Sequence, residues 1–287
     1  MDYEQDLQEL IKNALTEDIG HGDHSSLCCI PAATEGAAVL KIKQDGILAG
    51  VTVAEKIFRF AEPSVKFSAS KKDGDEMAFG ETAFEISGRV HTILQCERLV
   101  LNTMQRMSGI ATLTAKYVKR LEGYKTKLLD TRKTTPNFRL LEKEAVQIGG
   151  GVNHRFGLYD MIMLKDNHID YSGGIEKAIR NAYEYVRKNN FDLKIEVETR
   201  NLADVKKVVA IGKVDRIMLD NFTPEMITEA LKIIEGKTET EASGGINYEN
   251  IESYATTGVD YISSGAVIHQ AVSLDLSLKA IPLNHQQ

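Results

Sequence analysis

The stretch "LKIEVE" (Leu193–Glu198) is an apolar run of strand length that ends in a carboxylate, and "DRIMLD" (Asp215–Asp220) repeats this arrangement. A polar turn and a helical pattern separate the two runs. Buried strands that alternate with helices are typical of βα units, whose strands pair in parallel. The second half of the chain is therefore predicted to form a parallel sheet.

The same pattern recurs from about residue 126, in the runs "TKLLD", "MIML", "TETEAS" and "VDYISS". The residues that close the last five runs are 33, 22, 23 and 21 positions apart; they are Lys165, Glu198, Asp220, Ser243 and Ser264. One unit of a (β/α)8 barrel has about 30 residues, so the spacing favours a barrel. About six strands are readable, which is fewer than eight. We expect an incomplete barrel, and an open doubly wound sheet is the alternative.

The chain before residue 126 is less regular. Apolar residues at helical spacing predict a helix from Leu7 to Leu15, and strands are expected at 37–43 and 64–70 with a helix at 52–62 between them. A long helical pattern covers 91–123 and is expected to be interrupted around Ser108 and Gly109. These features predict a small α+β unit followed by a helix that bridges two domains.

We accordingly predict three segments: an N-terminal domain with the bridging helix at 1–110, a barrel catalytic domain at 111–275, and a C-terminal segment at 276–287 that returns to the N-terminal domain.

Composition and charge narrow the class of protein. The net charge is −6, with acidic and basic residues mixed along the chain, so nucleic acid and anionic membranes are not expected partners. Three cysteines do not suggest a disulfide framework. The first residues are acidic rather than apolar, and no run of about 18 apolar residues occurs. We expect a cytoplasmic protein.

The ends of the predicted strands carry charges and glycines. They read "DTRK" (130–133), "KDNH" (165–168), "EVETR" (196–200), "LDN" (219–221), "SGG" (243–245) and "SSG" (263–265). A barrel places its active site at the carboxyl ends of its strands, and glycine turns after the last strands often bind phosphate through backbone N–H groups. The alternative is that these glycines only permit tight turns.

Two carboxylates, Glu198 and Asp220, end neighbouring strands beside the glycine turns. They suit a hydrated magnesium ion held together with substrate phosphate oxygens. They equally suit the stabilisation of positive charge on a sugar ring during glycosyl transfer. A structural ion pair for either residue is the third interpretation.

A basic group accompanies them and comprises Arg132, Lys133, His154, Arg155 and Lys165. Arginine binds carboxylates in bidentate fashion, and lysine supplies a compact positive charge. Several such residues near strand ends indicate a substrate with more than one negative group. On a solvated surface the same residues would carry no functional meaning.

Five blocks now carry a resemblance that covers most of the chain: "ERLVLNTMQRMSGIAT", "TRKTTPNFRLLEKEAVQIGGGVNHRFGLYDMIMLKDNH", "KIEVETRNL", "RIMLDNF" and "EASGGI". Together and in this order they resemble the quinolinate phosphoribosyltransferase family, the carboxylating nicotinate-nucleotide pyrophosphorylases of NAD biosynthesis. The long second block is the most specific part.

The resemblance implies an α/β sandwich domain followed by an incomplete α/β barrel, working as a homodimer or higher homo-oligomer. The implied reaction joins quinolinate to 5-phosphoribosyl 1-diphosphate, with Mg²⁺ present, and releases diphosphate and carbon dioxide to leave nicotinate mononucleotide.

Site residues follow from the same resemblance. The implied quinolinate pocket comprises Arg132, His154, Arg155 and Lys165, with Arg98 donated from the partner subunit. The implied phosphoribosyl and diphosphate contacts are Lys133, Glu198, Asp220, Ser243, Gly244, Gly245, Ser264 and Gly265. The expected catalytic groups are Lys133, Lys165, Glu198 and Asp220, and the last two are the candidate metal ligands. His168, which closes "KDNH", is expected either to position the lysine loop or to contact substrate.

Three other functions fit parts of the sequence. A member of the same fold could act on a different heterocyclic acid. A lyase or aldolase could use Lys165 as a Schiff base. A non-catalytic phosphosugar-binding protein would need the glycine turns but not the basic group.

Overall fold

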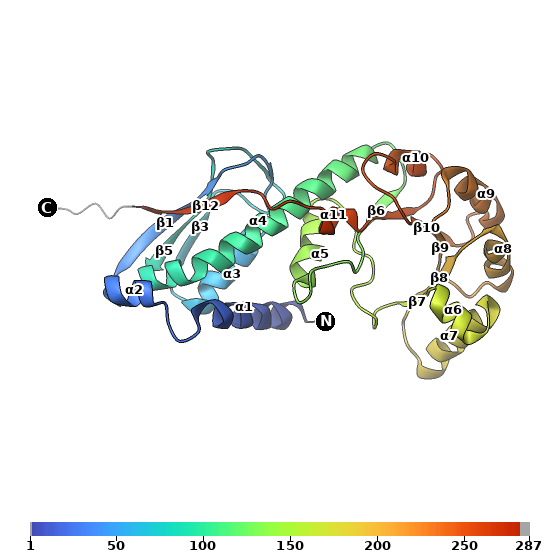
Figure 1. Ribbon diagram of the computed structural model, residues 1–287, viewed down its shortest axis with the longest axis horizontal. Helices are drawn as coiled ribbons and strands as arrows, with labels where there is room; N and C mark the ends of the chain where they lie inside the picture. Colours follow the sequence, from blue (N-terminus) through green and yellow to red (C-terminus); the bar gives the residue numbers. More distant parts are fainter. Residues whose placement is uncertain (1, 282–287) are drawn as a thin grey trace. The chain divides into compact units, whose positions relative to one another are not determined.

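The computed structural model describes residues 2–281 and divides into two compact units (Figure 1). The first unit comprises Met1–Ala115, Thr134–Gly150 and Ile268–Gln287, and the second comprises Lys116–Lys133 and Gly151–Val267. Of the predicted C-terminal segment, residues 282–287 lie outside the described part of the chain.

The first unit contains an antiparallel sheet in the order β12-β1-β5-β3. Its strands are β1 (Glu35–Ile42), β3 (Lys66–Ala69), β5 (Thr82–Arg89) and β12 (Leu276–Ile281), and a separate pair is formed by β2 (Gly46–Ile47) and β4 (Glu76–Met77). The strands predicted at 37–43 and 64–70 are confirmed as β1 and β3. Strand β12 pairs with β1, so residues from the end of the described chain complete this sheet.

The helices of the first unit are α1 (Tyr3–Ile19), α2 (His24–Cys29), α3 (Val51–Ala61), α5 (Arg139–Ile148) and most of α4 (Val90–Arg120), and α11 (Ala266–His269) runs into it. Helix α1 was predicted from its spacing, and its apolar residues Leu7, Ile11 and Leu15 are buried. Helix α3 packs on the sheet, where Phe58 lies with its ring centroid 6.2 Å from that of Phe84 on β5. Alternate residues of β1 are buried, because one face of its strand meets this apolar layer.

Helix α4 is continuous, so the interruption expected at Ser108 and Gly109 was wrong. The Ser108 hydroxyl accepts a hydrogen bond from the backbone N–H of Ala49 at 3.0 Å. A Cβ atom at Gly109 would lie 2.1 Å from the carbonyl oxygen of Val272. Glycine is present here because another backbone approaches closely, and the helix tolerates it at a cost of about 1 kcal/mol relative to alanine.

The second unit contains a parallel six-stranded sheet in the order β6-β11-β10-β9-β8-β7. Its strands are β6 (Lys127–Leu129), β7 (Ile162–Leu164), β8 (Ile195–Thr199), β9 (Arg216–Asp220), β10 (Glu239–Ser243) and β11 (Tyr261–Ser263). All six predicted strands are confirmed. Strands β7 to β11 are neighbours in chain order without the reversal of a doubly wound sheet, and β6 pairs with β11. The sheet is an incomplete barrel, open between β6 and β7.

Helices follow the strands on the outer side of this curved sheet (Figure 1). They are α6 (Asp166–Ser172), α7 (Ile175–Asn189), α8 (Leu202–Ile211), α9 (Pro224–Ile234) and α10 (Ile251–Ala255). Across residues 2–281, no helix combines the length and the apolar character that a membrane crossing requires.

The two faces of the parallel sheet differ in chemistry. Side chains alternate between faces along a strand, so Ile195 and Val197 share one face of β8 while Glu196 and Glu198 share the other. The pairing register places Arg216 of β9 opposite Glu196. The apolar face is covered by helices, and the opposite face, which lines the inside of the barrel, therefore carries charged groups.

Replacing Gly109 by alanine tests the close backbone approach. In an ordinary helix Gly→Ala stabilises by about 1 kcal/mol, but here the clash with the Val272 carbonyl is expected to destabilise the protein by about 1–3 kcal/mol. Urea denaturation measures the change, with Asn102→Ala at an exposed position of the same helix as the control. A more stable Gly109→Ala variant would contradict the packing described.

Candidate active site

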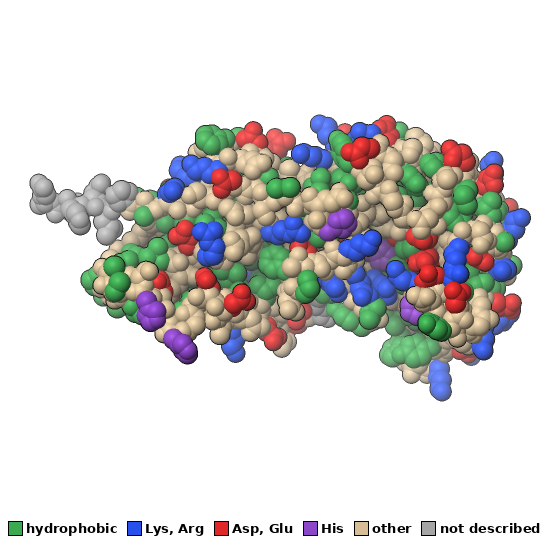
Figure 2. Space-filling model, in the orientation of Figure 1, with side chains coloured by type: hydrophobic (Ala, Val, Ile, Leu, Met, Phe, Trp, Pro, Cys, Tyr) green, Lys and Arg blue, Asp and Glu red, His purple; other side chains and the backbone are tan. Residues whose placement is uncertain are grey.

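The strand ends of the second unit bring acidic and basic side chains together, as expected for the carboxyl edge of a parallel sheet. Asp220 at the end of β9 is paired in register with Ser243 at the end of β10. Lys165 follows β7, and its Nζ atom lies 4.0 Å from Oε2 of Glu198 on β8. Figure 2 shows basic and acidic side chains mixed over the visible face, without a large area of one sign. The candidate site is therefore a local concentration of charge.

The carboxylates of Glu198 and Asp220 repel each other at this edge. Burial, followed by the charge of Asp220, raises the pKa of Glu198. Burial also raises the pKa of Asp220, while a hydrogen bond from Asn221 and the charge of Lys165 act in the opposite direction. A buried and a partly exposed carboxylate, with the charge of Asp220 disfavouring that of Glu198, are suited to a cation, either a metal ion or a cationic substrate atom.

The two arginines of the basic group also lie close together. Burial, and then the neighbouring guanidinium of Arg132, lowers the pKa of Arg155. The Nη1 group of Arg155 donates to the carbonyl oxygen of Met161 at 3.3 Å, and Lys133 is exposed. Like charges held side by side are stabilised by an anion between them, so this end of the site suits carboxylate or phosphate groups.

The glycine turns end the strands on the other side of Asp220. Gly244 has φ +97°, and a Cβ atom there would lie 2.3 Å from Oδ1 of Asn221, so a larger residue does not fit. Gly245 has φ +64°, with open space around its Cβ position. The hydroxyl of Ser264 donates to the carbonyl oxygen of Ile246 at 2.9 Å, which ties the two turns together. These turns present backbone next to the acidic pair.

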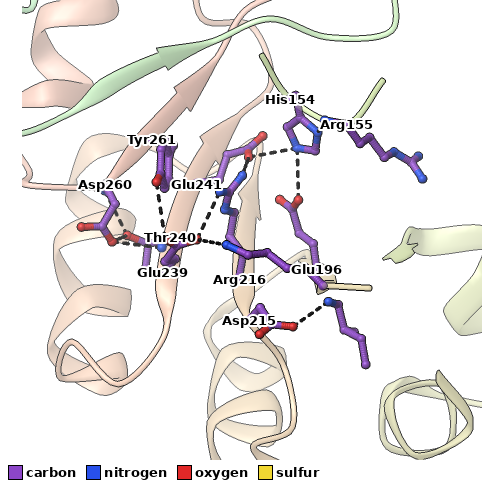
Figure 3. A network of polar contacts seen from close by, with 12 residues as sticks. His154, Arg155, Glu196, Asp215, Arg216, Glu239, Thr240, Glu241, Asp260 and Tyr261 are labelled. Carbon is purple, nitrogen blue, oxygen red and sulfur yellow. Dashed lines mark hydrogen bonds and ion pairs between the residues drawn. The ribbon is translucent and has the colours of Figure 1, made fainter. Parts of the chain in front are cut away.

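His154 takes part in a buried charge cluster inside the barrel (Figure 3). Its Nε2 atom lies 3.1 Å from Oε2 of Glu196 and 3.2 Å from Oε2 of Glu241. Nη1 of Arg216 lies 3.2 Å from the same Glu241 oxygen, and Nη2 lies 3.2 Å from Oε2 of Glu239. The side chains of Glu196 and Glu241 are fully buried, and Arg216 supplies positive charge between them.

Two influences act on the protonation of His154. Burial disfavours the imidazolium, whereas hydrogen bonds with Glu196 and then Glu241 raise the pKa of His154 to about 9. However, Nδ1 accepts a hydrogen bond from the backbone N–H of Arg155 at 2.6 Å, which a proton on Nδ1 would prevent. The acceptor role of Nδ1 favours a neutral imidazole with its proton on Nε2, whereas the carboxylates of Glu196 and Glu241 favour the imidazolium.

The carboxylates of the cluster respond to burial in different ways. Burial, followed by the charge of Glu241, raises the pKa of Glu196 to about 7. Burial by itself raises the pKa of Glu241. The hydrogen bond with His154 and the charge of Arg216 outweigh burial, so the pKa of Glu241 is lowered overall. His154, Glu196 and Glu241 also bring metal-ligand atoms within 4.8 Å of one another. Arg216 already supplies a cation there, so we assign no metal to this cluster.

Glu196, Arg216 and Glu241 were not predicted as functional residues. Arg216 and Glu241 lie inside predicted strands rather than at their ends, and Glu196, which begins the strand-end stretch "EVETR", was given no role of its own. The spacing of side chains along a strand could have revealed Glu196 and Glu241, because residues two positions apart share one face. Glu196 precedes Glu198 by two positions, and Glu241 precedes Ser243 by two. Charged residues spaced in this way within predicted strands indicated a polar inner face.

Two further residues named from the sequence, Arg98 and His168, lie on helices and not at strand ends. Arg98 is an exposed residue of α4 in the first unit, so its part in the site stays a prediction. His168 lies in the first turn of α6, and its Nδ1 accepts a hydrogen bond from the backbone N–H of Lys165 at 3.0 Å. His168 thus fixes the backbone of the lysine loop.

The fold and the strand-end groups define the class of protein: an α/β protein with an incomplete barrel and a site for anionic ligands at the carboxyl edge of its sheet. Residues 23–108 match the family model of the quinolinate phosphoribosyl transferase N-terminal domain, and residues 110–279 match that of its C-terminal domain. The chain belongs to the quinolinate phosphoribosyltransferase family.

Individual relatives agree with this assignment. A chloroplastic carboxylating nicotinate-nucleotide pyrophosphorylase of Arabidopsis thaliana is 44% identical over 289 residues, which cover 96% of this chain and 82% of the relative. A probable carboxylating nicotinate-nucleotide pyrophosphorylase of Bacillus subtilis is 40% identical over 272 residues, covering 95% of this chain and 92% of the relative. The crystal structure of NadC from Streptococcus pyogenes has a TM-score of 0.90 and 41% identity, with 98% of this chain and 99% of that chain covered.

Proposed function

We propose that this protein transfers the phosphoribosyl group of 5-phosphoribosyl 1-diphosphate to quinolinate and releases carbon dioxide, forming nicotinate mononucleotide and diphosphate. The observation that carries the proposal is the meeting of basic and acidic groups at the strand ends: Lys165 lies 4.0 Å from Glu198, and the charges of Lys165 and Lys133 act on Asp220. Arg132 and Arg155, whose charges act on each other, belong to the same strand-end group. Such an arrangement accommodates a dicarboxylate at one end and a cationic centre at the other. Membership of the family supports the same reaction.

The acid substrate would be bound by the basic end of the site. Quinolinate carries two carboxylates, which match the guanidinium groups of Arg132 and Arg155 in charge and geometry. The Nζ atom of Lys165 lies 4.0 Å from Oε2 of Glu198. We infer that it contacts the substrate carboxylate nearest the reacting nitrogen.

The transfer step needs no protein nucleophile. The lone pair of the quinolinate ring nitrogen forms a bond to the anomeric carbon, and the bond from that carbon to diphosphate breaks with its electrons on the leaving oxygen. Holding both anionic substrates in line turns a bimolecular step into an effectively unimolecular one. Glu198 and Asp220 are placed to stabilise positive charge on the ribose ring.

The phosphate groups would lie at the glycine turns formed by Ser243, Gly244, Gly245, Ser264 and Gly265, with Lys133 at the leaving diphosphate. Glu198 and Asp220 also fit a bound Mg²⁺, because a divalent cation relieves the repulsion that Asp220 exerts on the buried carboxylate of Glu198. Bound there, Mg²⁺ supplies charge neutralisation for diphosphate.

Decarboxylation follows from the charge made in the first step. The ring nitrogen becomes positively charged once it is bonded to ribose. The bond from the adjacent ring carbon to its carboxylate then breaks, its electrons stay on that carbon beside the cationic nitrogen, and the carbon takes up a proton. Arg155 and Lys165 would stabilise the electron-rich ring through preorganised positive charge.

We also propose that the protein works as a homodimer or higher homo-oligomer in which Arg98 completes the site of a neighbouring subunit. A reducing compartment such as the cytoplasm suits its cysteines, since Cys28, Cys29 and Cys96 are free thiols.

Diphosphate release tests the proposed function. Purified protein with quinolinate, 5-phosphoribosyl 1-diphosphate and Mg²⁺ is expected to release diphosphate and carbon dioxide in equal amounts, and chelation of the metal should abolish the release. Nicotinate in place of quinolinate serves as the control, because it lacks the second carboxylate. Turnover with nicotinate and none with quinolinate would contradict the proposal.

The roles of the two strand-end carboxylates can be separated from those of the arginines. Glu198→Gln and Asp220→Asn are expected to lower kcat/KM for 5-phosphoribosyl 1-diphosphate by about 100-fold, while the Kd of quinolinate changes by less than about threefold. Steady-state kinetics and calorimetry measure the two effects, with Asp192→Asn at an exposed position of the same unit as the control. The opposite ranking would assign these carboxylates to the acid substrate.

Sharing of Arg98 predicts complementation between inactive chains. Arg98→Ala and Arg132→Ala are each expected to be inactive, but a heterodimer of the two contains one site with both residues intact and should recover about half of the wild-type activity. Chains with different tags allow heterodimers to be purified before the assay. Purified heterodimers without activity would show that Arg98 acts within its own chain.

A further inference from the structure

The ring of His154 is held on both sides by groups of the second unit. Nε2 faces the carboxylates of Glu196 on β8 and Glu241 on β10, at 3.1 and 3.2 Å. Nδ1 accepts from the backbone N–H of Arg155 at 2.6 Å. Only 8% of His154 is exposed, so most of the ring lies inside the barrel.

This arrangement also fixes the backbone that carries Arg155. The backbone N–H of His154 donates to Oδ1 of the buried Asp130 at 2.8 Å, and the next N–H along the chain donates to the His154 ring. Two successive amides are thus bound by acceptors inside the barrel. Rotation of the His154 ring would break the second of these hydrogen bonds. The backbone at Arg155, from which its side chain extends, would then lose this anchor.

The two glutamates require Arg216 in order to be buried. A buried carboxylate without a partner costs several kcal/mol, and Arg216 contacts Glu241 at 3.2 Å while its guanidinium lies over the ring of Tyr261, 4.1 Å from the centroid. Glu239 contacts the same guanidinium through Nη2, but its side chain is 40% exposed, and the carboxylates that face His154 are those of Glu196 and Glu241. The strand therefore offers one glutamate that contacts the histidine and one that does not.

We propose that Glu196 and Glu241, held by Arg216, are positioning residues for the acid substrate: they lock the His154 ring in the orientation that fixes the Arg155 backbone and aims its guanidinium at a substrate carboxylate. They act through His154 and do not touch the substrate. The assignment rests on the proposed function, since it names the binding of quinolinate as the step they support.

Glu241→Gln tests this assignment, and Glu239→Gln is the matched control. Both changes remove one carboxylate from Arg216 on the same strand, but only the first alters the environment of His154. We expect Glu241→Gln to raise the Kd of quinolinate about tenfold, with the KM for 5-phosphoribosyl 1-diphosphate changed by less than about twofold. Glu239→Gln should leave both constants within about twofold. Equal effects of the two variants would overturn the proposal.

A double-mutant cycle with His154→Ala establishes whether Glu241 acts through the histidine. If it does, Glu241→Gln should add less than about twofold to the quinolinate Kd once the imidazole is gone. A full additional tenfold loss in the His154→Ala background would show that Glu241 works by another route and would overturn the proposal. Glu196→Gln provides the same cycle if the Glu241 variant does not fold.

Nitrogen NMR of the histidine rings gives a measurement that needs no substrate. In the wild-type protein at pH 7, His154 is expected to have a protonated Nε2 and an unprotonated Nδ1, and Glu241→Gln should shift these signals while Glu239→Gln does not. Protonation of both nitrogens in the wild type, or unchanged signals in Glu241→Gln, would overturn the assignment. If the wild type shows this signature but neither binds quinolinate nor releases diphosphate, the proposed function fails while the ring-locking contacts stand.

Discussion

The guanidinium of Arg216 allows the inside of the second unit to be polar. Barrel interiors are usually filled by branched apolar side chains, whereas here Glu196 on β8 and Glu241 on β10 lie buried on two strands of the same sheet that are separated by β9. Burial of two carboxylates would cost more than packing returns unless a cation lay between them. Arg216 lies on β9, between β8 and β10, so the strand order itself brings the cation to both glutamates.

This buried cluster and the open site form successive layers of one sheet face. Side chains two positions apart share a face, so Glu196 lies below Glu198 on β8, and Glu241 lies below Ser243 on β10. The lower layer holds His154, and the upper layer holds the acidic pair at the strand ends. Charge is therefore compensated internally in one layer, while the upper layer is left to be compensated by ligands.

The fold was largely predictable from the sequence because the strands of the second unit are short apolar runs separated by helical patterns of nearly constant length. The break expected at Gly109 was wrong because it came from a local rule, that glycine weakens an isolated helix. Helix α4 is stabilised by packing, and glycine is needed at position 109 because the Val272 carbonyl approaches the helix closely there. The closely approaching segment lies more than 160 positions away, so no local pattern could reveal it.

The strand-end residues of the site could be named from the sequence because a parallel sheet collects the ends of its strands at one edge, whatever the details of packing. The charged cluster behind them could not, since a glutamate inside a strand acquires a role only when a neighbouring strand brings Arg216 and a loop brings His154 within 3.2 Å. The sequence by itself determined the order of strands, the charges at their ends and the family. Tertiary structure decided the surroundings of the His154 ring and the pairing of the buried charges, because both depend on distances between residues far apart in the chain.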